Sequence, residues 1–128
     1  MLSYMEDPHA ADDEDRSIFH FRHGDPEAFK VIFIGYYGEF LSFAHMLLQR
    51  LPLARIVATD AFFFLWDRRV DFDTEKKIKT FLYVTIRNSC LRIIQDASPS
   101  LPDLEQTIEN TTLSPDLIRE LLAYTEKA

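Results

Sequence analysis

The segment ARIVATDAFFFLW, residues 54–66, decides the fold that this sequence predicts. Its apolar residues recur at helical spacing, and one side of the projected helix carries Ala54, Ala58, Ala61, Phe62, Leu65 and Trp66. Such a stripe is typical of a helix whose one face packs in a core. Leu51-Pro52-Leu53 predicts a turn before it, because proline disfavours a helical conformation in the preceding residue. We therefore expect this helix to cover about residues 53–69.

Two further helices are expected before this segment. Gly24-Asp25-Pro26 separates a short helix over about 15–23 from a longer one that ends near Arg50. Glycine suits the left-handed position after a helix, aspartate caps the next helix, and proline suits its first position. Gly35 and Gly38 each weaken the longer helix by about 1 kcal/mol relative to alanine. We expect close helix–helix approach at these glycines as the compensation.

Helical patterns also follow the segment. A helix is expected over about 76–95, and a last amphipathic segment over 115–126. Only 3 Gly and 6 Pro argue against an all-β protein, which needs many turns. The predicted fold class is therefore all-α, with a compact bundle of about four helices and an additional C-terminal helix.

The composition divides the chain into three parts. Residues 1–14 form an acidic tail that is predicted to be disordered, and residues 15–97 form the compact helical domain. Residues 98–128 read as a linker and the beginning of a second domain, whose last helix has no partner element in the sequence. The net charge is −7, but it is uneven, because residues 76–95 hold five basic residues and no acid. A basic helix between acidic flanks is a candidate phosphate-binding surface.

Several function classes find no support in the sequence. No run of apolar residues suggests a membrane span, and the acidic N-terminus does not resemble a signal peptide. The single Cys90 excludes an internal disulfide and fits a packing residue in a cytoplasmic protein. His20, His23 and His45 lack the spacing of a metal motif, and no phosphate loop or nucleophile elbow is present. We therefore expect no enzyme activity, metal or cofactor.

Three blocks in order resemble the extracytoplasmic-function sigma factors of bacterial RNA polymerase. Gly24-Asp25-Pro26-Glu27-Ala28-Phe29 is similar to the family's Gly-Asp-x-x-Ala-Phe opening. Residues 54–66 resemble its A-E-D-I-V-Q-(D/E)-x-F-x-x-L-W block, and residues 81–88, FLYVTIRN, resemble W/Y-L-Y-x-x-(A/V)-R-N. The lysine-rich residues 76–79 look like versions found in Bacteroidetes. The resemblance covers about residues 15–97, the second conserved region of these proteins.

The resemblance implies a helical bundle that initiates transcription by binding and melting promoter DNA. One face of such a domain docks on the β′ clamp helices of core RNA polymerase, and another captures the non-template strand of the minus-ten element. An anti-sigma factor is a further partner that the resemblance suggests. The family's second DNA-binding domain, a helix-turn-helix, does not follow the linker in this sequence.

Capture of a single strand needs cations for the backbone and aromatic or amide side chains for an extruded base. By resemblance, Asn88 lies where the family lines its base pocket, and Phe72 lies in the loop that covers this pocket. The residues predicted to bind DNA are Phe72, Lys76, Lys77, Lys79, Tyr83, Arg87, Asn88 and Arg92.

The positions that touch the polymerase clamp in the family depart from its pattern. Arg55 and Ile56 stand in place of two acids, Thr59 replaces a glutamine, and Asp60 alone keeps an acid. The residues predicted to bind polymerase or another partner are Arg55, Ile56, Thr59, Asp60, Phe63 and Phe64. Ile56 and Phe63 lie on the helix face opposite the core stripe, so they predict either an exposed apolar interface or a face buried under residues 101–128. These departures leave a second hypothesis open, a degenerate sigma-like module that binds a protein and no longer reads DNA.

Overall fold

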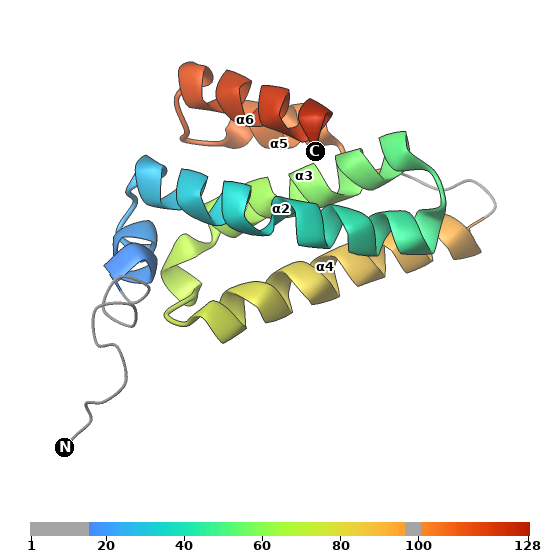
Figure 1. Cartoon of the computed structure of the whole chain (residues 1–128), viewed down its shortest axis with the longest axis horizontal. Helices are drawn as coiled ribbons and strands as arrows, with labels where there is room; N and C mark the ends of the chain where they lie inside the picture. The colour runs from blue at the N-terminus through green and yellow to red at the C-terminus, as the bar shows by residue number, and fades with distance from the viewer. Residues whose placement is uncertain (1–15, 97–100) are drawn as a thin grey trace.

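The computed structural model describes residues 16–96 and 101–128, and all its regular structure is helical. The all-α prediction is confirmed (Figure 1). Residues 16–22 form a short helix, and the later elements are α2 (Pro26–Leu48), α3 (Leu51–Asp67), the 3₁₀ turn η1 (Arg69–Asp71), α4 (Glu75–Gln95), α5 (Leu104–Asn110) and α6 (Pro115–Lys127). The acidic tail predicted at residues 1–14 lies outside the described residues, as do residues 97–100 of the predicted linker.

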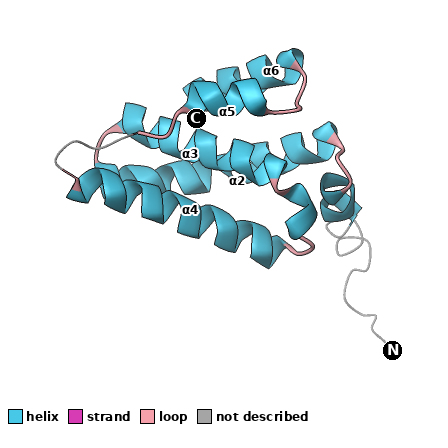
Figure 2. Cartoon of the chain, turned by 180° about the vertical axis from the view of Figure 1, so that it is seen from behind, coloured by secondary structure: helices cyan, strands magenta, loops and turns pink. Residues whose placement is uncertain are grey.

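The helices are stacked in three layers. The antiparallel pair α2 and α3 forms the middle, α4 covers one side of it, and α5 and α6 cover the other (Figures 1 and 2). This arrangement leaves one long side of α4 facing outward.

Aromatic side chains hold α2 against α3. Phe33 of α2 packs on Phe62 of α3 with 4.9 Å between ring centroids, and Phe29 packs on Trp66 at 5.4 Å. The predicted stripe of α3 is buried, but so are residues on its other sides, including Phe63, which is 0% exposed. The helix α3 is therefore enclosed by neighbours on more than one face.

The cap signals before α2 act as predicted. Gly24 has a φ of +91°, and the side chain of Asp25 accepts a hydrogen bond from the backbone N–H of Glu27 at 3.0 Å. The predicted turn at Leu51-Pro52-Leu53 is wrong, because α3 already begins at Leu51. Proline is tolerated there, since the first helical N–H groups have no partner within the helix.

The expected close approach at Gly35 and Gly38 is also wrong. Both glycines are exposed, and a Cβ atom added at either position would meet no atom within 4 Å. The packed side of α2 is its aromatic face, so the two glycines weaken the helix without a compensating contact.

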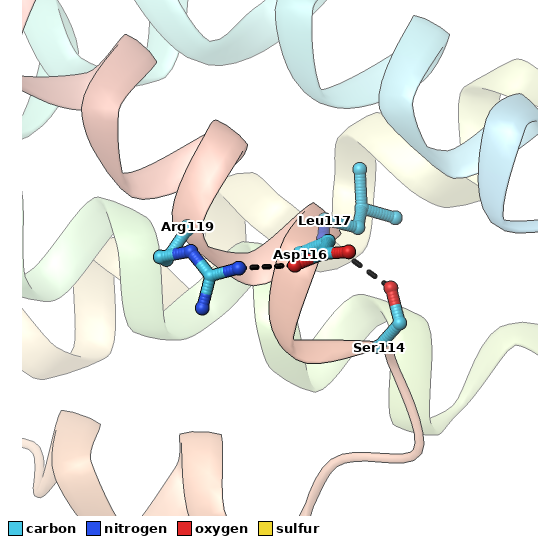
Figure 3. Close-up of polar contacts among 4 residues, drawn as sticks. All are labelled: Ser114, Asp116, Leu117 and Arg119. Atoms are coloured by element: carbon cyan, nitrogen blue, oxygen red, sulfur yellow. Dashed lines mark hydrogen bonds and ion pairs between the residues drawn. The ribbon is translucent and has the colours of Figure 1, made fainter.

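The C-terminal helices belong to the bundle, contrary to the expectation that the last helix lacks a partner element. Leu113, Leu117 and Leu121 are buried in the same core as α2 and α3. Ser114 caps α6 by accepting a hydrogen bond from the Leu117 N–H at 3.2 Å, and Asp116 pairs with Arg119 (Figure 3). The sequence-based division after residue 97 is therefore not a boundary of the packed core.

The helix α2 is long and apolar enough to cross a membrane, with a mean hydropathy of 1.4 over its best window. The core helix of a globular protein passes the same test, and 33% of this window is buried inside the bundle.

If α6 is part of the cooperative core, Leu121→Ala will lower the free energy of unfolding by about 2–5 kcal/mol, the usual cost of a cavity at a buried leucine. Urea denaturation measures this change. Leu101→Ala is the control, because Leu101 is 42% exposed and should change stability by no more than about 0.5 kcal/mol. Equal effects of the two variants would show that α6 does not fold with the bundle.

Candidate nucleic-acid interface

The outward side of α4 carries most of the residues predicted to bind DNA. Lys76, Lys77, Tyr83, Arg87, Asn88 and Arg92 are all exposed. The inward side of the same helix is apolar, and its buried residues are Ile78, Leu82, Ile86, Cys90 and Ile93. The amphipathic pattern therefore turns the basic residues away from the core, toward solvent.

Two of the lysines make contacts within the chain. Lys77 pairs with Asp73 at 2.9 Å, and this ion pair lowers the pKa of Asp73 below its usual value. Lys79 lies over the ring of Tyr36, with its Nζ atom 5.0 Å from the ring centroid. Both contacts involve cations in the N-terminal half of α4.

Phe72 does not have the predicted position over a pocket lined by Asn88. Phe72 is buried, and its ring packs on Phe81 with 5.0 Å between centroids. Together they line a hollow of about 560 Å³ beside Lys76 and Lys77. Asn88 is 13 residues beyond the first residue of α4, a distance of about 20 Å along a helix. The prediction that Phe72 covers the Asn88 pocket is therefore wrong.

Asn88 instead lines a separate cavity of about 570 Å³ between α3, α4 and α5. Arg92 lines the same cavity from α4, one helical turn further on. Most of the other lining groups are polar, and they comprise Asp60, Phe64 and Asp67 of α3, Thr85 and Ser89 of α4, and Pro102, Asp103, Gln106, Thr107 and Asn110 in and before α5. Such a cavity offers hydrogen-bond donors and acceptors as well as one aromatic side chain.

A buried acid lies at the wall of this cavity. Asp60 is only 6% exposed, and its Oδ1 atom accepts a hydrogen bond of 2.6 Å from the hydroxyl of Thr107. Burial raises the pKa of Asp60, repulsion from Asp103 adds to the increase, and the Thr107 hydrogen bond opposes it. Burial likewise raises the pKa of Asp67. The carboxylate of Asp60 is therefore poorly solvated, whereas Asp67 is an exposed residue.

The exposed apolar patch predicted from Ile56 and Phe63 is not present in the structure. Phe63 is fully buried and packs near the rings of Phe29 and Phe33, while Ile56 is partly buried. The physical reason is that Phe63, like Phe62 and Trp66 of the predicted stripe, lies close to aromatic rings of α2 and so does not face outward.

The other residues predicted to bind polymerase are divided between the core and the surface. Thr59 is buried, and its hydroxyl shares a hydrogen bond of 2.9 Å with the hydroxyl of Tyr37. Phe64 is 43% exposed, and Arg55 is partly buried, with an Nε atom that has no hydrogen-bond partner among the described residues.

Sequence reasoning missed two contributions to the interface. The helix α5 supplies one wall of the Asn88 cavity, and its start has a recognisable signal, since Asp103 is followed three residues later by Gln106 and accepts a hydrogen bond from the Gln106 N–H. Phe43 of α2 packs on Tyr83 with 4.7 Å between ring centroids. No local signal could have revealed that pair, because the two residues lie on different helices.

The cysteine and the three histidines, the candidates for catalysis or metal binding, occupy positions typical of packing and surface residues. Cys90 is confirmed as a packing residue, since it is fully buried and burial raises the pKa of its thiol to about 11. His20, His23 and His45 are exposed, and no three His, Cys, Asp or Glu side chains in residues 16–96 and 101–128 gather in a way that could hold a metal ion.

Comparison with known proteins identifies no relative. No family model matches the chain, and neither a curated protein nor a solved structure shows significant similarity to it. The likeness to sigma factors therefore rests on the three sequence blocks.

The buried Asp60 makes a pH-dependent prediction. Because its pKa is raised from 3.8 in the folded protein, this group contributes most to stability below pH 3.8 and loses that contribution as pH rises through the raised value. Asp60→Asn keeps an acceptor for Thr107 without the charge, so it should be more stable than the parent at neutral pH. The difference in free energy of unfolding between the variant and the parent should become smaller toward about pH 4, where Asp60 of the parent is protonated.

Chemical denaturation at several pH values measures this difference. Glu109→Gln on the exposed side of α5 is the control and should show no such trend. If the difference in stability between Asp60→Asn and the parent stays constant with pH, the pKa of Asp60 is not raised in the folded protein.

Proposed function

We propose that the chain is a sigma-factor domain of the region 2 type, which holds single-stranded promoter DNA along the outward side of α4. The observation that carries the proposal is that residues 76–95 contain five cations and no acid, and that four of these cations are exposed on an outer helix of the bundle. Phosphate neutralisation by lysine and arginine supplies the sequence-independent part of such binding.

The Asn88 cavity is the proposed place for an extruded base. An amide offers one donor group and one acceptor to the edge of a base, and Gln106 and Asn110 offer the same groups from α5. The carboxylates of Asp60 and Asp67 would repel a phosphate but accept a hydrogen bond from an amino group of a base. The backbone of the strand would therefore stay on the outer side of α4 while a base enters.

Contact with the β′ clamp helices of core polymerase is the second part of the proposal. Phe64 is the most accessible of the α3 residues that the resemblance assigns to this contact, and Arg55 and Ile56 are partly accessible. Thr59, Asp60 and Phe63 are covered in the folded chain, so they would support the shape of α3 and make no direct contact with the clamp. Asp60 is covered by Thr107 of α5, whereas Thr59 and Phe63 contact residues of α2.

The covered α3 residues also favour the alternative of a sigma-like module that binds a protein partner without reading DNA. The chain's net charge of −7 would disfavour the binding of nucleic acid anywhere outside the basic helix. The alternative requires no specific role for the cations of α4, so their substitution distinguishes the two functions.

Replacing Lys76, Lys77 and Lys79 with alanine should weaken binding of single-stranded DNA and flatten its salt dependence. The log–log slope should change by about 0.7 for every phosphate that is no longer neutralised. Fluorescence anisotropy of a labelled oligonucleotide over a series of salt concentrations measures the slope. Alanine at Arg50 and Lys127, two exposed cations outside α4, is the matched control. An unchanged slope in the triple variant would exclude the α4 lysines as phosphate ligands.

Asn88→Ala should weaken binding to one preferred promoter oligonucleotide by about 1–3 kcal/mol, the usual value of a specific base contact. Binding to scrambled sequences should change little, because it depends on the lysines. The measurement uses the chain together with core polymerase, and Gln95→Ala at the exposed end of α4 is the control. Equal losses on preferred and scrambled strands would favour the protein-binding alternative.

A further inference from the structure

A second aromatic site lies between α2 and α4, apart from the Asn88 cavity. The ring of Phe43 from α2 stacks on the ring of Tyr83 from α4, with 4.7 Å between centroids and 24° between planes. Tyr83 nevertheless stays 48% exposed, and Phe43 is partly buried. One side of the tyrosine ring is therefore held by the bundle while the remainder of the ring is open to solvent.

Next to this pair is a hollow of about 270 Å³. It is lined by Glu39 and Phe40 of α2 and by Lys79, Thr80 and Tyr83 of α4. The hollow thus combines two aromatic side chains, a cation, the hydroxyl group of a threonine and one carboxylate. A flat aromatic ligand that carries negative charge beside the ring and amino groups on its edge matches this set of groups.

Cations stand on both sides of Tyr83 along the helix. Lys79 precedes Tyr83 by four residues and Arg87 follows it by four, so all three lie in one row on the same side of α4. The row is about 12 Å long at 1.5 Å per residue. The Nζ atom of Lys79 lies over the Tyr36 ring.

We propose that the hollow beside the Phe43–Tyr83 pair is a stacking site for one unpaired nucleobase of a single DNA strand. The base stacks on Tyr83, Lys79 and Arg87 bind the phosphates on its two sides, and Phe43 is a positioning residue that backs the tyrosine ring. Glu39 accepts a hydrogen bond from an exocyclic amino group, so the site prefers cytosine to thymine. This inference rests on the proposed binding of single-stranded DNA by α4.

The test compares oligodeoxycytidine, oligodeoxythymidine and an abasic strand of the same length by fluorescence anisotropy. Tyr83→Leu should weaken binding of both base-bearing strands by about tenfold, the scale of one base–aromatic stack. Its salt slope should stay that of the parent, because no cation is removed. The abasic strand should bind the parent and the variant equally well.

Two further variants test the roles of Phe43 and Glu39, and a third serves as a control. Phe43→Leu should cause a smaller loss than Tyr83→Leu, and Glu39→Ala should remove the preference for cytosine over thymine. Phe19→Leu is the control, because Phe19 is also an exposed aromatic residue but does not line the hollow. Thermal unfolding of each variant tests whether it is folded, and Tyr83 is a half-exposed side chain rather than a core residue.

The outcomes distinguish this inference from the function on which it rests. If Tyr83→Leu binds the base-bearing strands within about twofold of the parent while the α4 lysine variant still flattens the salt slope, the stacking site is overturned and the proposed function stands. An equal loss on the abasic strand would also overturn stacking. If the parent binds no single strand, the proposed function fails first and the stacking site with it.

Discussion

The burial of α3 on more than one side is the constraint on which the rest of this structure depends. Phe62 and Trp66 pack on aromatic rings of α2, and Phe63 is fully enclosed as well. A helix with apolar residues in several directions needs a neighbour in each of them. The layers formed by α4 on one side and by α5 and α6 on the other meet this requirement.

The same constraint explains why α4 is amphipathic. Because α4 covers the middle layer from outside, it buries only one side and exposes the other over its whole length. The buried side is apolar, from Ile78 to Ile93, and the exposed side is basic and aromatic. A chain with an acidic net charge therefore presents a local cationic surface on one helix. Asp73 pairs with Lys77 there, and Glu39 lines the same hollow as Lys79.

On the other side of α3, packing against α5 buries an ionisable side chain, that of Asp60. Asp60 keeps a single described hydrogen bond, from Thr107, while burial and Asp103 both disfavour its ionised form. Leu113, Leu117 and Leu121 of the same C-terminal segment are buried in the core. The cavity that Asn88 lines lies on the same side of α3, between α3, α4 and α5.

The sequence by itself determined the helical class, the caps at Asp25 and Pro26, and the cationic side of α4, because these depend on residues within a few positions of one another. It did not reveal the direction of Phe63 or the lack of close contact at Gly35, since periodicity describes one helix and not its number of neighbours. Only the tertiary structure decided three further features. They are the separation of Phe72 from the Asn88 cavity, the Asp60–Thr107 hydrogen bond and the Phe43–Tyr83 pair. Each depends on how separate helices dock, and docking is fixed by the fit of whole packed surfaces rather than by local spacing.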